Sequence, residues 1–307
     1  MKKGPGLKLG VIGVGSMGAH HARIAATSLP GVKLFAVADP NETRARQIAQ
    51  TYGSLVFANY QEMLPQVDAV SIVAPTSLHF EIGLNCLTSK KHVLIEKPLA
   101  ANSEEARSLS DYASSHGLVL AVGHIERFNP AYQGLLKLIK KEKILGIDIK
   151  RLSPFPERIS DANVIQDMMI HDLDLLLSLL PTDEIDSIKA EGEKLKSKNL
   201  DSVKAVICFK SGIIARIETS RVFADKTRIF NVTTDTALFS ADLLNKTIMI
   251  RDFKTHIPSV HSVKQIDQLT AELKDFCQSI KKVATPMTDG QAAYKAIKLA
   301  EEVEKQC

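Results

Sequence analysis

Three ionisable side chains stand at helical spacing in the segment VIQDMMIHDLDLL. Asp167, His171 and Asp174 occupy positions i, i+4 and i+7, which share one face of a helix. A carboxylate one turn from a histidine orients the imidazole and stabilises its charged form, as a general base requires. An ordinary helix ion pair or a capped histidine has the same spacing, so the pattern alone leaves both interpretations open.

A second candidate group follows an apolar strand. The segment HVLIEKPLA places Glu96, Lys97 and Pro98 directly after the strand-like residues. Proline stops strand pairing because it has no N–H, and it holds the preceding residue extended. We therefore predict that Lys97 projects beyond the strand end with its ammonium group available for negative charge. A surface ion pair would explain Glu96 and Lys97, but it would not explain the proline.

A glycine-rich turn opens the chain. The segment GVIGVGSMGAHH carries Gly13, Gly15 and Gly18 in the order GxGxxG, after a predicted strand and before a predicted helix. The first glycine allows a tight turn, the second lets the backbone approach a diphosphate, and the third lets helix and strand pack closely. Exposed N–H groups at the helix start, including those of Ser16 and Met17, would bind the diphosphate. The pattern predicts dinucleotide binding, with a structural glycine turn as the alternative.

The residues after the second strand indicate which dinucleotide binds. Asp39 lies roughly 20 residues after Gly18, where a carboxylate can accept a hydrogen bond from a ribose 2′-hydroxyl and would repel a 2′-phosphate. We therefore predict NAD rather than NADP. Arg44 either stacks on the adenine or is a solvated helix charge. His20 and His21 point roughly 100° apart on a helix, so they cannot chelate one metal and are predicted to lie on the surface.

Composition favours a small-molecule partner. The chain has 307 residues, which favours two domains, and it is 45% hydrophobic and 24% charged, as in ordinary globular proteins. Its net charge of +4 is spread along the chain and forms no basic stripe for nucleic acid. No apolar segment of the sequence is long enough to span a bilayer. The four cysteines are far apart without CxxC spacing, which predicts neither a zinc site nor disulfides and favours the cytoplasm.

The pattern of strands and helices changes near residue 123. Before it, almost wholly apolar strands alternate with helices, which predicts a doubly wound parallel sheet in a Rossmann domain over residues 1–123. After it, helices near 130–141 and 164–180 precede strands with period-two alternation and short turns. These predict an antiparallel sheet with one exposed face in a second domain, residues 124–307, which ends with helices near 263–282 and 289–304. The strands expected in the first domain are LKLGVIGV, KLFAVAD, LVFA, AVSIVAP, HVLIE and LVLAVG.

Taken together, GVIGVGSMG, VAPTSLH, EKP, VGHIERFNP and the D-x-x-x-H-x-x-D helix resemble the Gfo/Idh/MocA family of NAD(P)-dependent sugar oxidoreductases over nearly the whole chain. The resemblance implies a Rossmann domain followed by an α/β domain that binds substrate. That second domain has a large, open, mainly antiparallel sheet through which members form homodimers or homotetramers. The family's lysine, carboxylate and histidine fall on Lys97, Asp167 and His171. The residues that fall beside the nicotinamide half of the cofactor are Ala74, Pro75, Thr76, His79 and Glu96.

Within the family, VGHIERFNPAY, SPFPERI and VIQDMMIHDLDL look most like the branch of UDP-N-acetylglucosamine 3-dehydrogenases. That branch oxidises the sugar's C3 hydroxyl so that an aminotransferase can install an amine, for example for a lipid A sugar. The resemblance implies that His171 is the base, that Asp167 orients it and that Lys97 stabilises the alkoxide; the opposite roles for Lys97 and His171 stay open. Many relatives have glycine before the helix, whereas this chain has the residues 161–164, DANV.

A diphosphate in the substrate requires cations. Arginine suits phosphate because its planar guanidinium can bond two oxygens at once. Arg127, Arg151 and Arg158 are the candidates, each with a surface or structural role as the alternative. His124 either contacts substrate or caps the strand that ends at Gly123.

Two other functions stay open at the level of sequence. A sugar or cyclitol dehydrogenase of the same family that acts on a free polyol would have no use for diphosphate-binding arginines. A catalytically silent NAD-binding regulator would be expected to lack Lys97 or His171, and both residues are present.

Overall fold

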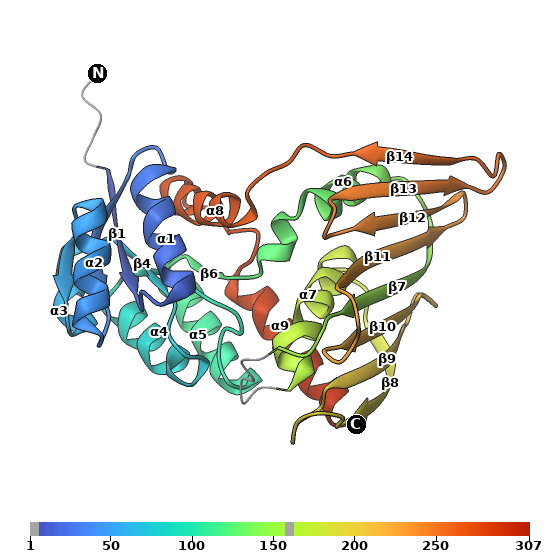
Figure 1. The fold of residues 1–307 in the computed structure, drawn as a ribbon, viewed down its shortest axis with the longest axis horizontal. Helices are drawn as coiled ribbons and strands as arrows, with labels where there is room; N and C mark the ends of the chain where they lie inside the picture. The colour runs from blue at the N-terminus through green and yellow to red at the C-terminus, as the bar shows by residue number, and fades with distance from the viewer. Residues whose placement is uncertain (1–5, 157–162) are drawn as a thin grey trace. The chain divides into compact units, whose positions relative to one another are not determined.

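The computed structural model describes residues 6–156 and 163–307 (Figure 1). The chain divides into two units: unit 1 consists of residues 1–125 and 267–294, and unit 2 of residues 126–266 and 295–307. The sequence predicts a single boundary after residue 123, with everything beyond it in the second domain. In the structure, residues 267–294 return to unit 1. The physical reason is α8 (Gln268–Lys282), whose Leu273 and Phe276 are buried in one core with Ala22 and Ala25 of α1 (Ser16–Thr27).

Unit 1 is built on a six-stranded sheet with the order β3-β2-β1-β4-β5-β6, in which all neighbouring strands are parallel. This confirms the doubly wound fold. The strands are β1 (Leu7–Ile12), β2 (Val32–Ala38), β3 (Leu55–Phe57), β4 (Ala69–Ile72), β5 (His92–Ile95) and β6 (Leu120–Val122). Besides α1 and α8, the helices are α2 (Glu42–Tyr52), α3 (Tyr60–Met63), α4 (His79–Thr88) and α5 (Ser103–Ser115).

Side-chain caps set the helix boundaries in unit 1. The side chain of Asn41 accepts a hydrogen bond from the Arg44 N–H at 3.0 Å, so α2 starts after it. The side chain of Asn102 caps α5 in the same way. The predicted start of α8 near residue 263 is early, because Asp267 is the cap and accepts from the Thr270 N–H at 3.3 Å.

Unit 2 contains an eight-stranded sheet with the order β14-β13-β12-β11-β7-β10-β9-β8. Strands β7 and β10 are parallel and the other neighbouring pairs are antiparallel, which confirms the large, mainly antiparallel sheet. Strands β7, β8 and β14 were not among the strands expected from the sequence. The strands are β7 (Ile144–Leu152), β8 (Ile185–Glu193), β9 (Ser202–Phe209), β10 (Ile214–Ser220), β11 (Thr227–Thr234), β12 (Ala237–Asp242), β13 (Thr247–Asp252) and β14 (Pro258–Ser262).

Helices cover one face of this sheet. Tyr132 of α6 (Pro130–Leu138) and Leu173 of α7 (Ile170–Leu179) are buried in one core with Ile149 and Phe230 of the sheet. A π-helical turn, Ile165–Met169, leads directly into α7. Helix α9 (Gly290–Glu304) starts in unit 1, and its residues from Lys295 onward belong to unit 2. Along β9, buried and more exposed residues alternate, because the helices cover only one face.

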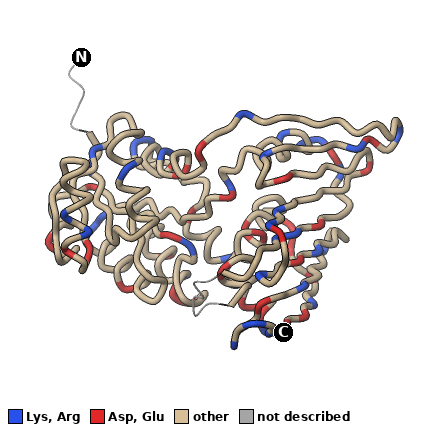
Figure 2. The backbone as a smooth tube through the Cα atoms, viewed as in Figure 1, with Lys and Arg blue, Asp and Glu red and all other residues tan. Residues whose placement is uncertain are grey.

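Acidic and basic residues are interspersed along the chain in both units (Figure 2). Among the helices in the described ranges, none is long and apolar enough to cross a membrane. Within the same ranges, no cluster of three or more His, Cys, Asp or Glu side chains is placed to hold a metal ion.

Candidate active site

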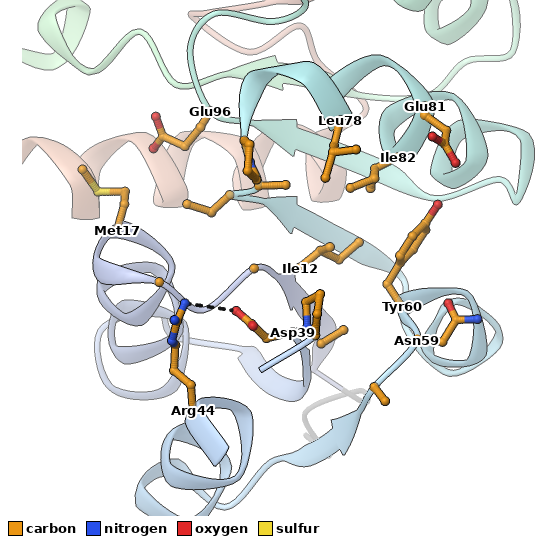
Figure 3. A pocket seen from close by; sticks show the side chains of 18 of the residues that line it. Ile12, Met17, Asp39, Arg44, Asn59, Tyr60, Leu78, Glu81, Ile82 and Glu96 are labelled. Atoms are coloured by element: carbon orange, nitrogen blue, oxygen red, sulfur yellow. Dashed lines mark ion pairs between the residues drawn. The ribbon is translucent and has the colours of Figure 1, made fainter. Parts of the chain in front are cut away.

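A cavity of about 800 Å³ lies at the carboxyl ends of β1, β2 and β4 in unit 1 (Figure 3). Its walls come from the glycine turn after β1, from the turn after β2 and from the segments after β3, β4 and β5. Ligands of doubly wound sheets bind at this edge. The predicted cofactor residues that line the cavity are Gly13, Gly15, Ser16, Met17, Asp39, Arg44, Ala74, Pro75 and Glu96.

Each of the three positions in the turn requires glycine for a different structural reason. Gly13 has φ +83°, and a Cβ there would lie 2.5 Å from the Val73 carbonyl oxygen. A Cβ on Gly18 would lie 1.9 Å from the Gly13 carbonyl oxygen, so only glycine allows this packing. At Gly15 the nearest atom to an added Cβ would be Nη1 of Arg44 at 3.6 Å. The backbone of Gly15 is therefore open to the cavity, as close approach of a diphosphate requires.

Asp39 connects the glycine turn to the end of β2. Its Oδ2 accepts a hydrogen bond from the Val14 N–H, and its Oδ1 accepts one from the Asn41 N–H, both at 2.8 Å. Nη1 of Arg44 lies 3.7 Å from Oδ2, and the Arg44 side chain is about half exposed. A carboxylate has about four acceptor positions, so Asp39 can still accept a bond from a ribose hydroxyl.

Glu96 lies across the cavity from Asp39 and Arg44 (Figure 3). The following Lys97–Pro98 peptide bond is cis, and the Lys97 side chain is half-buried. Neither Lys97 nor Thr76, which begins a short 3₁₀ turn after β4, is part of the cavity wall.

His79 is buried beneath the wall that it was expected to line. Its Nδ1 lies 2.7 Å from the Pro98 carbonyl oxygen, and its Nε2 lies 2.8 Å from the Ala74 carbonyl oxygen. His79 therefore holds the segments after β4 and β5 together.

The prediction that both histidines of α1 lie on the surface is wrong for His21. His20 is exposed, whereas His21 is fully buried. Nδ1 of His21 lies 2.8 Å from Oγ of Ser71, and Nε2 lies 3.0 Å from Oε1 of Glu96. The sequence carries a signal for this burial, because Gly18, His21 and Ala22 occupy positions i, i+3 and i+4 on the small-residue face of the helix.

Other cavity residues were also missed from the sequence. Asn59 and Tyr60 follow β3, and Leu78, Glu81 and Ile82 lie at the start of α4 or just before it. The position of β3 was itself predicted, and the carboxyl ends of parallel strands share one edge of a sheet. The segment after β3 was therefore foreseeable as part of the wall.

In unit 2, the predicted row of three polar side chains separates into two environments. Asp167 lies in the π-helical turn and His171 in the first turn of α7, and both are half-buried. Asp174 is buried, and its two carboxylate oxygens accept hydrogen bonds from Nε and Nη2 of Arg127, each at 2.7 Å. Asp174 therefore forms a buried ion pair with Arg127.

Arg127 and Arg151 are held by carboxylates inside unit 2. Arg151 donates to both carboxylate oxygens of Asp172, at 2.9 and 2.8 Å, and to Glu126 at 3.1 Å. Burial raises the pKa of Glu126, but the cations of Arg151 and Arg228 outweigh burial, so that pKa is lowered. These ion pairs favour the structural alternative for both arginines.

Two candidate substrate-binding residues remain, Arg158 and His124. Arg158 lies outside the described residues. His124 follows β6 and is buried, with its backbone N–H donating to the Val122 carbonyl oxygen at 2.7 Å.

The fold and the cavity together define a dinucleotide-binding dehydrogenase. Residues 7–124 match the family model for the Gfo/Idh/MocA oxidoreductase family with an NAD-binding Rossmann fold. Residues 150–239 match the model for the C-terminal domain of the same family. The chain belongs to the Gfo/Idh/MocA oxidoreductase family and is an NAD-dependent dehydrogenase of the kind that acts on sugars or cyclitols.

Relatives match along almost the entire chain. UDP-N-acetylglucosamine 3-dehydrogenase of Acidithiobacillus ferrooxidans is 35% identical over 97% of this chain and 96% of its own length. A solved structure of that enzyme superposes with a TM-score of 0.92 and covers 98% of this chain and 97% of the other. The NAD(+)-dependent scyllo-inositol 2-dehydrogenase of Bacillus subtilis is 28% identical over 92% of this chain and 88% of its own length.

Proposed function

We propose that this protein is a UDP-N-acetylglucosamine 3-dehydrogenase that oxidises the sugar's C3 hydroxyl to a ketone. One observation carries the proposal: the identity to an enzyme with that activity is 35% over 97% of the chain, against 28% for the scyllo-inositol enzyme. The resemblance of the segments VGHIERFNPAY and VIQDMMIHDLDL to the same branch supports it independently of overall identity.

In this proposal, unit 1 holds the cofactor through residues of the cavity. The open backbone at Gly15 and the N–H groups of Ser16 and Met17 bind the diphosphate, and Asp39 accepts from the ribose. Bound NAD⁺ supplies the acceptor for the hydride.

The chemical roles fall to three side chains. His171 takes the proton of the sugar hydroxyl, and Asp167, one turn before it, orients the imidazole and stabilises its charged form. The ammonium of Lys97 stabilises the developing alkoxide. If Lys97 is the base and His171 stabilises the alkoxide, the overall reaction is the same. The two assignments differ in which substitution, at Lys97 or at His171, changes the pH dependence of the rate.

One observation favours a second candidate, oxidation of a free polyol or cyclitol. Arg127 and Arg151 donate to Asp174, Asp172 and Glu126 inside unit 2, so their guanidinium groups are committed to carboxylates. A free polyol has no diphosphate and needs no such cations.

The deciding experiment compares substrates directly. Purified protein is mixed with NAD⁺ and either UDP-N-acetylglucosamine, myo-inositol or scyllo-inositol, and NADH is followed by its absorbance. An aminotransferase with glutamate is added to remove the ketone. We expect NADH from the nucleotide sugar and calorimetric binding of UDP alone; NADH from an inositol without UDP binding selects the second candidate. No NADH from any of them would indicate a silent NAD-binding regulator.

The setting of the reaction follows from the same proposal. The ketone has the chemistry of a transamination substrate, as for an amino sugar of lipid A or another envelope component. We propose a cytoplasmic homodimer or homotetramer that assembles through the sheet of unit 2, in agreement with the alternation of buried and exposed residues along β9. Light scattering would measure the subunit number.

A further inference from the structure

Two ionisable side chains of unit 1, His21 and Glu96, meet beside the cavity, and a third, Glu272, interacts with Glu96 through its charge. His21 of α1 and Glu272 of α8 are buried, and Glu96 after β5 lines the cavity with its side chain 17% exposed. Nε2 of His21 lies 3.0 Å from Oε1 of Glu96. The same ring's Nδ1 lies 2.8 Å from Oγ of Ser71, so both imidazole nitrogens are engaged.

The carboxylate of Glu96 is held from several directions. Its Oε2 accepts a hydrogen bond from the Lys97 N–H at 3.2 Å. The glycine at position 123 gives this oxygen its room, because a Cβ there would lie 2.8 Å from it. If the His21 ring carries its hydrogen on Nε2, Nε2 donates to Oε1 of Glu96 and Nδ1 accepts from the Ser71 hydroxyl. Both ring nitrogens, the carboxylate oxygen and the hydroxyl then each have a hydrogen-bond partner. The orientation of the Glu96 carboxylate is therefore fixed.

Glu272 occupies an apolar position on α8. It lies on the same helix face as Leu269, Leu273 and Phe276, which belong to the core around α1. Among the described residues, neither carboxyl oxygen of Glu272 has a hydrogen-bond partner. Burial, then the negative charge of Glu96, then that of Asp275 raise the pKa of Glu272 well above its usual value of 4.5. The raised pKa favours the protonated form of Glu272, and Glu96 is the carboxylate of the two that lines the cavity.

The position of Glu96 relates this charge to one half of the cofactor. Asp39 directly follows β2 on one side of β1, and Glu96 directly follows β5 on the other side, beyond β4. Because the ribose-binding acid marks the adenosine half, Glu96 marks the nicotinamide half. The nicotinamide ring is positively charged in NAD⁺ and neutral in NADH. A fixed carboxylate in a partly desolvated site stabilises the charged ring selectively.

We propose that His21, Glu96 and Glu272 form one unit that presents the Glu96 carboxylate to the cavity in a fixed orientation, and that this unit sets the preference of the pocket for NAD⁺ over NADH. His21 and Glu272 are positioning residues, because they act through Glu96. The other ionisable groups around the unit are Lys97 after β5, His124 after β6 and Asp275 on α8. The proposal depends on the cofactor and not on the sugar, so failure of either substrate assignment leaves it unaffected.

The main test measures the dissociation constants of NAD⁺ and NADH by calorimetry with full-length protein. In Glu96→Gln, the ratio of the NADH constant to the NAD⁺ constant should fall by at least about tenfold. The matched control is Glu104→Gln in α5, which removes one exposed carboxylate of unit 1 that does not line the cavity and should leave the ratio within about twofold. Equal ratios in the two variants would overturn the proposal.

His21 gives a second test that does not require Glu96→Gln to fold. Leucine at position 21 removes the hydrogen bond from the imidazole to Oε1 of Glu96, so the carboxylate is no longer held in one orientation and His21→Leu should lower the ratio several-fold. His21→Gln keeps an amide donor for Glu96 and should restore most of the ratio. If both variants lower the ratio equally, His21 does not act through this hydrogen bond.

Glu272 is tested by thermal stability. The unfolded chain loses this proton above about pH 4.5 while the folded chain retains it, so the wild-type protein loses stability as pH rises. Glu272→Gln has no proton to lose. The melting temperature of Glu272→Gln minus that of the wild type should therefore increase from pH 4 to pH 8. A difference that stays constant or decreases would contradict a protonated Glu272.

Discussion

The cavity of unit 1 and the charged helix region of unit 2 use the same residue types in opposite ways. At the cavity, Asp39 accepts bonds from the backbone of Val14 and Asn41, and its side chain still borders open space. In α7, the carboxylates of Asp172 and Asp174 form buried ion pairs with Arg151 and Arg127. Whether a charge serves a ligand or the fold is thus decided by the partners that surround it.

Neighbouring positions on α7 make the same contrast within one helix. Asp172 and Asp174 point into buried ion pairs, whereas His171, directly before Asp172, is only half-buried. Asp167 precedes them in the π-helical turn. Such turns are frequent at functional sites, which agrees with the proposed roles of Asp167 and His171.

The largest effect should come from His171→Ala, which tests whether the half-buried positions carry the chemistry. Loss of a positioned general base lowers turnover by about 10² to 10⁴. NADH formation gives the rate, and calorimetric titration should show unchanged NAD⁺ binding. The control His261→Ala removes an exposed histidine of the same unit. Equal turnover in the two variants would remove His171 from the mechanism.

Arg151→Ala tests the claim that the arginines of unit 2 serve the fold. It leaves Asp172 buried without its cation and leaves Glu126 with Arg228 alone, so the free energy of unfolding should fall by about 3–5 kcal/mol. Denaturant titration measures the change. Arg216→Ala breaks an exposed pair with Asp148 and should cost at most about 1 kcal/mol. If Arg151→Ala lowers the free energy of unfolding only slightly, Arg151 is again a candidate for binding the diphosphate of the substrate.

Gly15→Ala tests the open backbone of the cavity. The new methyl group would meet no atom of the protein closer than 3.6 Å, and Gly15 has φ −64°, so folding should be unaffected. The methyl group would instead occupy space that the diphosphate needs and should cost about 1–3 kcal/mol of NAD⁺ binding free energy. Gly146→Ala in β7 is the control. Unchanged NAD⁺ affinity in Gly15→Ala would place the diphosphate elsewhere.

Asp201 sharpens the comparison, because it is an acid of unit 2 that accepts backbone bonds as Asp39 does. Its Oδ2 accepts from the N–H groups of Leu195, Lys196 and Ser197 at 2.7–2.9 Å, and its Oδ1 accepts from Arg221. Burial raises the pKa of Asp201, but these donors outweigh burial and hold it well below 3.8.

A lowered pKa means that Asp201 contributes stability above pH 3.8 and loses that contribution as pH falls further. Asp201→Asn should therefore lower the free energy of unfolding by about 1–3 kcal/mol at pH 7. The difference from the wild type should shrink below pH 3.8. Denaturant titrations across this range would measure it, and a cost independent of pH would show that the charge of Asp201 is unimportant.

Local patterns in the sequence determined much of this protein. The six strands of unit 1, the glycine turn, the caps at Asn41 and Asn102 and the use of NAD follow from periodicity, backbone geometry and hydrogen bonds between residues a few positions apart. These features are readable because each depends on a short stretch of chain.

Only the tertiary structure decided which residues meet across long separations in sequence. The return of α8 to unit 1, the burial of His21 against Ser71 and Glu96, and the pairing of Arg127 with Asp174 join positions that are far apart along the chain. The sequence around a charged residue does not distinguish whether its side chain faces solvent, a ligand or a buried partner. Its environment is set by packing, because burial is stable only where the fold supplies a neutralising partner or keeps the proton in place.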